Sequence, residues 1–248
     1  MFLTKTADLI YDALLTIAYP NACSLCSRSV ETRRWGPACI DCWRATQVFD
    51  GSEAICWKCG SLAREAFRPV NPENIRCNRC ADHLFVTARS CGVYEGALRE
   101  SVLRLKRQPT IPLHLTTLLV NAARQTPLAQ ATRLIPVPLH PDRERQRGFN
   151  QATIIARILA AELNLIVDET SLTRTVSSEK YRAGLDVKGR HDTVSEAFAV
   201  TAPRVLKDES ILLVDDVFTT GATASSCAET LLAAGVSEVH VLTIARPR

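Results

Sequence analysis

Short apolar runs alternate with amphipathic segments from about residue 84 to the end of the chain. The expected strands are 85–93, 133–137, 211–214 and 239–244, and the expected helices are 95–107, 113–124, 150–163 and 221–234. In the expected helices apolar residues recur every three to four positions, whereas the expected strands are short and β-prone. This alternation predicts an α/β fold with a parallel sheet flanked by helices.

The first third of the chain follows a different pattern. Residues 2–18 carry apolar side chains at helical spacing, which predicts a short amphipathic helix. Residues 20–82 are rich in turn residues and contain few apolar stretches. Such a segment cannot form its own hydrophobic core and needs cross-links, such as a metal ion or disulfides, to fold. We therefore expect a helix and a cysteine-rich module over 1–82, followed by an α/β domain over 83–248.

Composition places the 248-residue chain among ordinary globular proteins. Its 46% hydrophobic and 23% charged residues exclude a disordered, collagen-like or coiled-coil protein, and a net charge of +4 excludes nothing further. No apolar run approaches the ~18 residues of a membrane span. Asp8 and Asp12 interrupt what would be the apolar part of a signal peptide. These features predict a cytoplasmic protein without membrane insertion.

Eight of the ten cysteines form four CxxC pairs. They are Cys23, Cys26, Cys39, Cys42, Cys56, Cys59, Cys77 and Cys80. One tight turn presents both sulfurs of a pair to a tetrahedral ion, and two such turns complete a four-thiolate zinc site. A reducing compartment and the fourfold repetition favour zinc over disulfides, an iron–sulfur cluster or a thiol-redox motif. We predict two structural zinc ions, with the pairing open between a sequential and an interleaved arrangement.

The same region has a second interpretation, as a contact surface for nucleic acid or protein. Five arginines accompany three tryptophans, namely Arg28, Arg33, Arg34, Arg64, Arg68, Trp35, Trp43 and Trp57. Cations beside stacking rings suit single-stranded nucleic acid. Tryptophans in a small zinc module, however, more often form its packing. Both interpretations stay open on the sequence.

The strongest chemical signal follows the expected strand 211–214. Asp215 and Asp216 stand at its carboxyl end, where open α/β sheets bind ligands. The turn that then opens a helix consists of Thr219, Thr220, Gly221, Ala222 and Thr223. Its hydroxyls and backbone N–H groups suit a phosphate dianion. Adjacent acids suit the vicinal hydroxyls of a ribose or a hydrated Mg²⁺, the alternative being a pair that only caps the helix.

A basic loop follows the expected strand 133–137. It consists of Pro138, Leu139, His140 and Pro141, followed by Arg143, Arg145 and Arg147. Three guanidinium groups within five residues predict an anion site, with a solvated loop as the alternative. His140 is a candidate substrate contact because it stands beside them, whereas Cys91 and Cys227 are expected to be core thiols.

Two of these motifs resemble known families. Residues 211–223 resemble the phosphoribosyl pyrophosphate (PRPP) motif of type I phosphoribosyltransferases. Residues 134–152, with Pro-Val-Pro-Leu-His and Arg-Gly-Phe-Asn-Gln-Ala, resemble the signature of the ComF family of competence-associated predicted phosphoribosyltransferases. Similar members carry an N-terminal zinc ribbon with CxxC pairs, so the resemblance covers almost the whole chain. It implies a type I phosphoribosyltransferase-like sheet after a double zinc ribbon.

The resemblance also implies an activity, in which phosphoribosyl is transferred from PRPP with release of pyrophosphate and Mg²⁺ accompanies PRPP. Asp215 and Asp216 would hold the ribose hydroxyls, and residues 219–223 would cradle the 5′-phosphate. The residues implied for pyrophosphate are Pro138, Leu139, Arg143, Arg145, Arg147 and Lys106, and those implied for catalysis are Asp215, Asp216 and Arg147. Thr219 replaces the Asp of members that act on 6-oxopurines, which argues against hypoxanthine or guanine as acceptor.

The polar segment 166–196, expected to be a flap, departs from the family pattern. Arg174, Arg190 and residues 197–198 match it, but Lys180 and Tyr181 stand near the family's Gln, and Asp192 stands near its Asn. The acceptor is therefore not indicated. A rival hypothesis is a non-catalytic adaptor that senses PRPP or associates with single-stranded DNA or competence proteins. The intact acid pair favours the enzyme, and homodimers are common among similar enzymes.

Overall fold

The computed structural model describes residues 16, 21–63, 75–175 and 197–248. Several predictions lie outside these residues: the helix over 2–18, Arg64, Arg68 and residues 176–196 of the expected flap.

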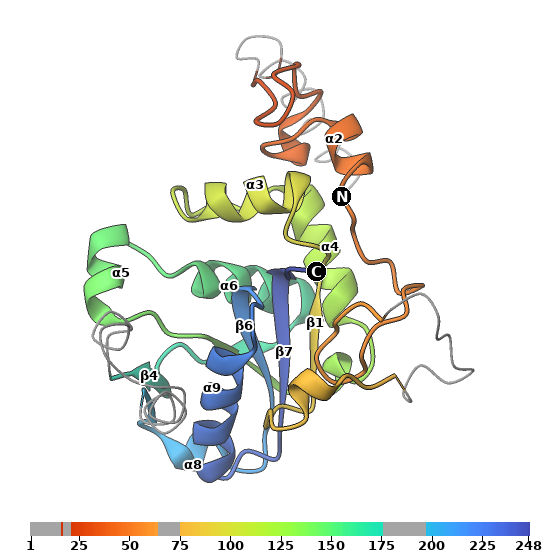
Figure 1. Ribbon diagram of the computed structural model, residues 1–248. Coiled ribbons are helices and arrows are strands. Elements are labelled where there is room, and N and C mark those ends of the chain that lie inside the picture. The colour runs from red at the N-terminus through yellow and green to blue at the C-terminus, as the bar shows by residue number, and fades with distance from the viewer. Residues whose placement is uncertain (1–15, 17–20, 64–74, 176–196) are drawn as a thin grey trace, which may run out of the picture.

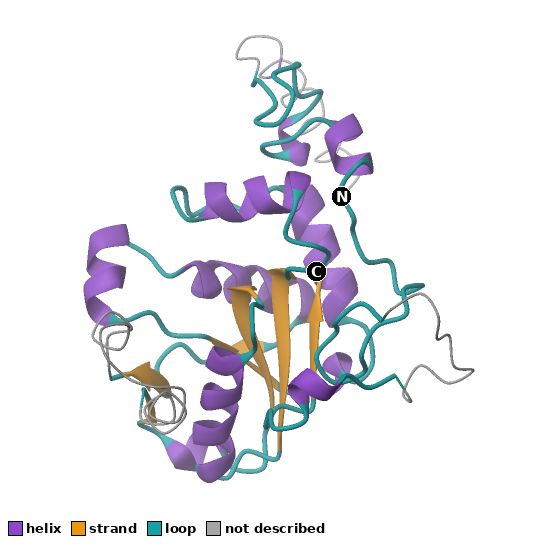
Figure 2. Ribbon diagram, viewed as in Figure 1, coloured by secondary structure: helices purple, strands orange, loops and turns teal. Residues whose placement is uncertain are grey.

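A five-stranded parallel sheet forms the centre of the protein (Figures 1 and 2). Its spatial order is β1 (Thr87–Ser90), β7 (Glu238–Ala245), β6 (Ser210–Val217), β2 (Arg133–Pro136) and β3 (Ile166–Val167). Because every neighbouring pair is parallel, the carboxyl ends of the strands share one edge. The predicted fold, a parallel sheet flanked by helices, is confirmed.

The predicted helices correspond to four elements of the structure. They are α3 (Gly96–Leu105), α4 (Leu113–Ala123), α6 (Gln151–Leu163) and α9 (Ala222–Ala233). The shorter helices are η1 (Arg33–Trp35), α2 (Ile40–Arg44), η3 (Asn78–Cys80), η4 (Leu128–Gln130), α5 (Pro141–Arg147) and α8 (Pro203–Leu206). Within the described residues, none of the helices has the length and apolar content that crossing a membrane requires.

Alternate residues of β6 enter cores on opposite faces of the sheet. Leu212 and Val214 pack in the core that contains residues of α3, α4 and α6. Ile211 and Leu213 pack in the core that contains residues of α9. A strand buried on both faces is apolar throughout, which explains its continuous hydrophobic run. An antiparallel ribbon of β4 (Leu172–Arg174) and β5 (Phe198–Val200) lies beside α9.

The cysteine-rich segment contributes to both cores. Residues around Trp43, which is 4% exposed, pack with α3 and α4 on one face. Cys56 and Cys80 pack with Phe85 and Ala88 on the other face. In Figure 1 the first part lies beyond α3 and α4, and the second part lies beside β1. The division of the chain at residue 82 stays a prediction.

Candidate functional site

The eight cysteines of the CxxC turns gather into two groups of four. The first is Cys23, Cys26, Cys39 and Cys42, and the second is Cys56, Cys59, Cys77 and Cys80. Within each group all sulfurs lie within 4.8 Å of one another. Zn–S bonds of about 2.3 Å in a tetrahedron place sulfurs about 3.8 Å apart. The observed Sγ–Sγ distances of 3.6 Å for Cys26–Cys39 and 3.5 Å for Cys59–Cys77 are close to that value. Each group can hold a zinc ion, and the CxxC turns pair sequentially.

Each group contains an equivalent backbone hydrogen bond to sulfur, which favours the thiolate form. The backbone N–H of Cys39 donates to Sγ of Cys23 at 3.3 Å, and that of Cys77 donates to Sγ of Cys56 at 3.3 Å. An N–H aimed at sulfur favours its charged form, which is the form that binds metal. Four cysteine ligands leave no open position for a substrate, so both groups fit a structural metal.

The two acids lie at the carboxyl end of β6, as the sequence predicts. Oδ2 of Asp216 lies 3.2 Å from Nζ of Lys106, which follows the last turn of α3. Oδ1 of Asp215 accepts a hydrogen bond from the backbone N–H of Asp216 at 2.8 Å. Burial and the charge of Asp216 raise the pKa of the Asp215 carboxyl to about 7. The structure therefore brings the predicted Lys106 to the acid pair.

The turn after the acids is open to solvent and leads directly into α9. Thr219, Thr220, Ala222 and Thr223 are exposed, and the first N–H groups of a helix have no partner within it. Gly221 has φ +85°. A Cβ at this position would lie 2.7 Å from Nε2 of His83 and 2.7 Å from a ring carbon of Phe218. A small pocket runs from Asp215 along this turn. Its donors can bind an anion of phosphate size.

His83 contacts the turn of residues 219–223 at Thr220 and Gly221. Its Nε2 lies 3.0 Å from the carbonyl oxygen of Thr220, and burial lowers the pKa of the imidazole, so a neutral ring with one N–H can donate. The next residue, Leu84, donates its N–H to Oγ of Ser225 in α9 at 3.2 Å. The N–H of His83 itself donates to the carbonyl of Cys80. Only Ala81 and Asp82 therefore separate a cysteine of the second group from a contact with the turn. The sequence carried no motif that marked His83.

The basic loop folds into a short helix, where the sequence predicts a stiff loop. Pro141 occupies the first turn of α5, and Nδ1 of His140 accepts from the N–H of Asp142 at 3.2 Å. Acids at the start and arginines at the end of α5 complement its dipole. Gly148, with φ +82°, ends it. His140 is thus a helix cap, a role that its neighbouring arginines did not indicate.

Asn150 links the two ends of the segment that carries α5. Its Nδ2 donates to the carbonyl of Val137 at 2.9 Å, and its Oδ1 accepts from the N–H of Ala152 at the start of α6. The side chain is 7% exposed. The Asn of the Arg-Gly-Phe-Asn-Gln-Ala motif therefore joins the end of β2 to the start of α6, which fixes the base of the segment that carries α5.

The three arginines of α5 differ in their surroundings. Arg145 is 77% exposed and pairs with Asp142. Arg143 and Arg147 are half-buried and stand four residues apart, on one face of the helix. Nη1 of Arg147 donates to Oε1 of Gln151 in α6. Arg143 and Arg147 can therefore act on one ligand together.

Arg174 of β4 is a further cation at this site. Its guanidinium interacts electrostatically with Asp215 and Arg143, and burial lowers its pKa. The Cζ atom lies 5.2 Å from the centre of the Phe198 ring, across the ribbon. The sequence showed Arg174 only as a match in the expected flap. Its place next to the acid pair depends on how β4 packs.

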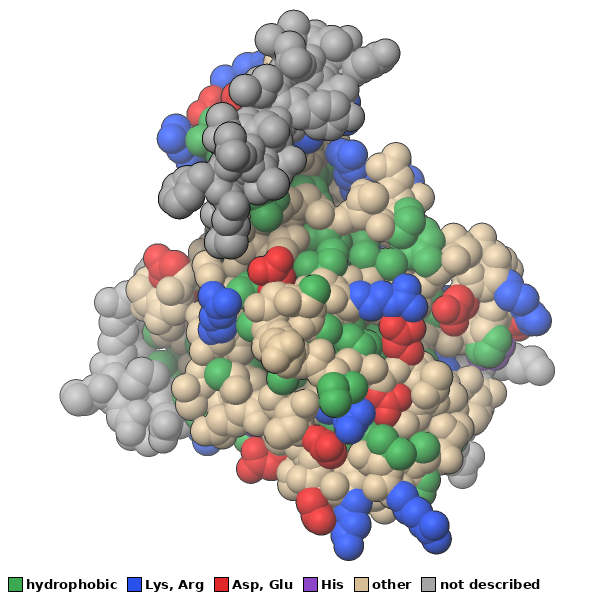
Figure 3. Space-filling view, turned by 180° about the vertical axis from the view of Figure 1, so that it is seen from behind, with side chains coloured by type: hydrophobic (Ala, Val, Ile, Leu, Met, Phe, Trp, Pro, Cys, Tyr) green, Lys and Arg blue, Asp and Glu red, His purple; other side chains and the backbone are tan. Residues whose placement is uncertain are grey.

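Two of the three tryptophans, Trp35 and Trp43, pack against α4. Trp35 and Trp43 contact the ring of His114 in α4, with centroids 4.4 Å and 4.5 Å apart. Nε1 of Trp43 donates to the carbonyl of Trp35 at 2.9 Å. On the face seen in Figure 3, Lys and Arg side chains are interspersed with Asp and Glu. These contacts agree with the packing interpretation for Trp35 and Trp43.

Comparisons with known proteins give one family model and several similar proteins. Residues 146–248 match the family model of the phosphoribosyl transferase domain. Competence protein ComFC of Bacillus subtilis (strain 168) is 24% identical over 78% of this chain and 84% of its own length. DNA utilization protein YhgH of Escherichia coli (strain K12) is 30% identical over 241 residues, which are 94% of this chain and 99% of that protein. The chain belongs to the ComF family. The expected ComF resemblance is confirmed.

The ComF chain also has a likeness to a solved structure. Glutamine PRPP amidotransferase from B. subtilis, complexed with ADP and GMP, matches with a TM-score of 0.36 and 18% identity. The match covers 59% of this chain and 26% of the other. The roles of individual residues in this ComF protein stay predictions.

Proposed function

We propose that this ComF protein is a phosphoribosyltransferase that binds PRPP and transfers its phosphoribosyl group to an acceptor, releasing pyrophosphate. The observation that carries the proposal is the acid pair Asp215 and Asp216 at the end of β6, directly before the open turn of residues 219–223. The match of residues 146–248 to the phosphoribosyl transferase domain supports the class of reaction.

The acid pair and the turn have complementary roles in the proposal. The carboxylates of Asp215 and Asp216 accept hydrogen bonds from the two ribose hydroxyls. Backbone N–H groups and hydroxyls of residues 219–223 donate to the 5′-phosphate. Lys106 is held near Asp216 before substrate arrives. It then turns its ammonium toward the pyrophosphate.

Cations from three elements receive the leaving group. These are Lys106 after α3, Arg143 and Arg147 on α5, and Arg174 on β4. We assign the backbone at Pro138 and Leu139 to the same pyrophosphate site. Asp215 and Asp216 also offer the carboxylate oxygens that Mg²⁺ prefers. When bound with PRPP, Mg²⁺ would supply additional neutralisation of the pyrophosphate charge.

The chemical step breaks the bond between the anomeric carbon and pyrophosphate and forms one from that carbon to the acceptor. Positive charge develops on the ribose as the leaving group departs with the electron pair. Catalysis then rests on holding the ribose in position and stabilising the negative charge of the leaving group.

Pyrophosphate release tests this function. The zinc-loaded protein is incubated with PRPP, Mg²⁺ and a pool of bases, amines and other metabolites, and ribosylated products are identified by mass spectrometry. We expect release of pyrophosphate that depends on both PRPP and a component of the pool. Absence of both PRPP binding and pyrophosphate release would contradict the proposal.

Arg147 and Arg145 form a matched pair for the pyrophosphate site. We expect Arg147→Met to weaken PRPP binding by at least about tenfold, because a charge-assisted hydrogen bond to phosphate contributes about 1.5–3 kcal/mol. Arg145→Met should change the affinity less than about twofold, because its exposed guanidinium already pairs with Asp142. Calorimetric titration with PRPP measures both. Equal effects would mean that α5 acts only through its net charge.

His83→Ala tests whether the turn needs its support. We expect PRPP affinity to fall several-fold for two reasons. The carbonyl of Thr220 loses its hydrogen-bond donor, and the imidazole ring that packs against Gly221 is removed. His83→Gln keeps an N–H donor and should recover part of the affinity. Inorganic phosphate, titrated in the same variants, should follow PRPP. An unchanged phosphate affinity in His83→Ala would show that the contact is only structural.

A second candidate function is the non-catalytic adaptor. The names of the relatives, a DNA utilization protein and a competence protein, favour a link to DNA uptake. A steep salt dependence of retention on single-stranded DNA, reduced by Arg33→Gln and Arg44→Gln, would support it if no PRPP turnover is found. A homodimer and a cytoplasmic location also stay predictions.

A further inference from the structure

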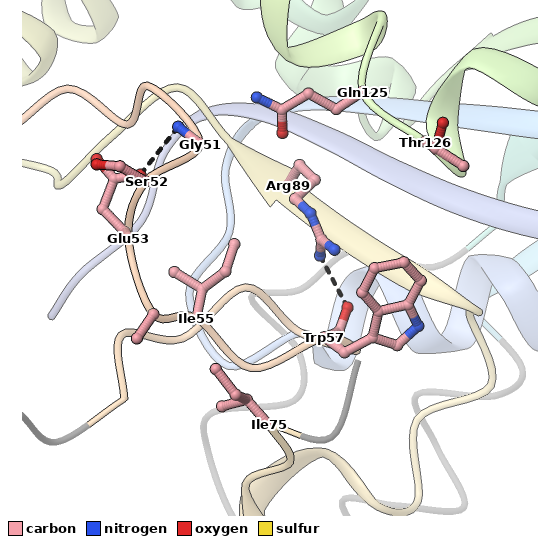
Figure 4. A pocket seen from close by; sticks show the side chains of 10 residues that line it. Gly51, Ser52, Glu53, Ile55, Trp57, Ile75, Arg89, Gln125 and Thr126 are labelled. Carbon is pink, nitrogen blue, oxygen red and sulfur yellow. Dashed lines mark hydrogen bonds between the residues drawn. The ribbon is translucent and has the colours of Figure 1, made fainter. Parts of the chain in front are cut away.

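A second pocket lies away from the acid pair, where the cysteine-rich segment meets the edge of the sheet (Figure 4). The loop of residues 51–57 forms one wall, and Gln125 and Thr126, after α4, form another. Arg89 reaches into it from β1. The pocket encloses about 310 Å³, the size of a small-molecule site.

Arg89 is buried, yet two of the nitrogens of its guanidinium have no hydrogen-bond acceptor among the described residues. The residue is 7% exposed, and all three of its hydrogen bonds leave from Nη1, to the carbonyls of Trp57 and Ala88 and to Oγ1 of Thr87. The described residues supply no acceptor for Nε or Nη2. Neither nitrogen is fully shielded from solvent. Since Arg89 lines the pocket, we infer that these two donors are available to a ligand there.

The charge of Arg89 is not balanced by a carboxylate from the described part of the chain. The groups that act on it electrostatically are the sulfurs of Cys56 and Cys59 and the guanidinium of Arg76. Burial lowers its pKa to about 10, so the side chain is a cation at neutral pH. Glu53, at the rim, is already engaged: its two oxygens accept from the backbone N–H groups of Asp50 and Gly51, each at 3.1 Å.

The remaining walls combine apolar and neutral polar groups. Ile55, Ile75 and the ring of Trp57 form the apolar part, and Gln125 and Thr126 add an amide and a hydroxyl. A phosphate dianion would lose much of its hydration here for a single cation and would face the negative charge of Glu53. A monoanion with an apolar body matches both the charge and the walls.

We propose that this pocket binds a small organic monocarboxylate. Its carboxylate accepts two parallel hydrogen bonds from Nε and Nη2 of Arg89, and its apolar body lies against Ile55, Ile75 and Trp57. Arginine is suited to this role because its planar fork matches a carboxylate. The site is separate from the acid pair and does not depend on PRPP chemistry.

Benzoate and its neutral analogue benzamide test the proposal on the full-length, zinc-loaded protein by calorimetry and ligand-observed NMR. We expect benzoate to bind one site at least about tenfold more tightly than benzamide, because only the carboxylate gains charge-assisted hydrogen bonds. Inorganic phosphate should not compete at this site.

Three variants locate the bound carboxylate. Arg89→Lys keeps the charge but removes the fork and should weaken benzoate at least about tenfold. Ile75→Trp fills the space without removing the cation and should abolish binding even where Arg89→Lys does not fold. Arg76→Met removes a nearby exposed cation and should change the affinity less than about twofold.

The opposite results would overturn the proposal. Equal affinity for benzoate and benzamide, no saturable binding, or binding unchanged in Ile75→Trp would each show that the pocket is not a carboxylate site. Arg89 would then serve only as a counter-charge for the second cysteine group. PRPP titrations on the same variants keep this result separate from any failure at the acid pair.

Discussion

Replacement of both Asp215 and Asp216 by asparagine is expected to weaken PRPP binding by at least about 100-fold while the chain remains folded. Each carboxylate would lose a charge-assisted hydrogen bond to a ribose hydroxyl, worth about 1.5–3 kcal/mol, and each 1.4 kcal/mol corresponds to a factor of ten. Calorimetric titration at pH 8, above the pKa of about 7 of the Asp215 carboxyl, measures the effect.

The single variant Asp215→Asn should also stabilise the folded chain at high pH. The folded pKa of about 7 lies above the ordinary 3.8, so between these values the folded state binds the proton more tightly than the unfolded state. The stability of the parent therefore falls as pH rises through this window, by on the order of 2–4 kcal/mol. Asparagine carries no such penalty, so its melting temperature should exceed that of the parent at pH 8 and approach it near pH 4.

Opposite effects on binding and stability separate a functional acid from a structural one. Glu229→Gln, on an exposed position of α9, is the matched control and should change neither quantity. A double variant that binds PRPP within a few-fold of the parent would show that the acid pair is not the ribose site. A less stable Asp215→Asn at pH 8 would show that its carboxyl is stabilised by the neighbouring cations.

Loss of the second cysteine group is expected to weaken PRPP binding at least about tenfold, whereas loss of the first should spare it. The variants are Cys56→Ser with Cys80→Ser, and Cys23→Ser with Cys39→Ser, all at buried positions. Structural zinc binds with about 10–16 kcal/mol, comparable to the whole stability of a domain, so the fold around each lost ion should be lost too. Native mass spectrometry should count two zinc ions in the parent and one in each variant.

The difference between the two groups lies in what each supports. The second group leads through Cys80 and His83 to the carbonyl of Thr220, so its loss should weaken PRPP at least about tenfold. The first group packs on α4 through Trp43 and His114, away from that turn. Equal losses of PRPP affinity in both variants would mean that they act by general destabilisation. Unchanged affinity in both would mean that the turn needs no support from the metal groups.

Much of the fold could be predicted because its signals are local. The run Ile211–Val214 is apolar at every position because both faces of β6 are buried, and the acids after it mark the edge of the sheet. Helices with a continuous amphipathic period, such as α6, were also predicted. The exceptions were short: β3, β4 and β5 have two or three residues each, too few for a period, and α5 depends on the caps at His140 and Gly148.

By itself the sequence determined which chemical groups this ComF protein carries. They are four CxxC turns, an acid pair, a Thr/Gly turn and a basic loop, each formed by residues that are neighbours in the chain. Tertiary structure decided which of these groups meet. It paired the CxxC turns in order and joined the two groups to different hydrophobic cores. It also brought His83 and Arg174 to the acid pair and its turn, and Arg89 to a separate pocket. These contacts join residues far apart in the chain, and they form only because burial of apolar side chains packs the elements together.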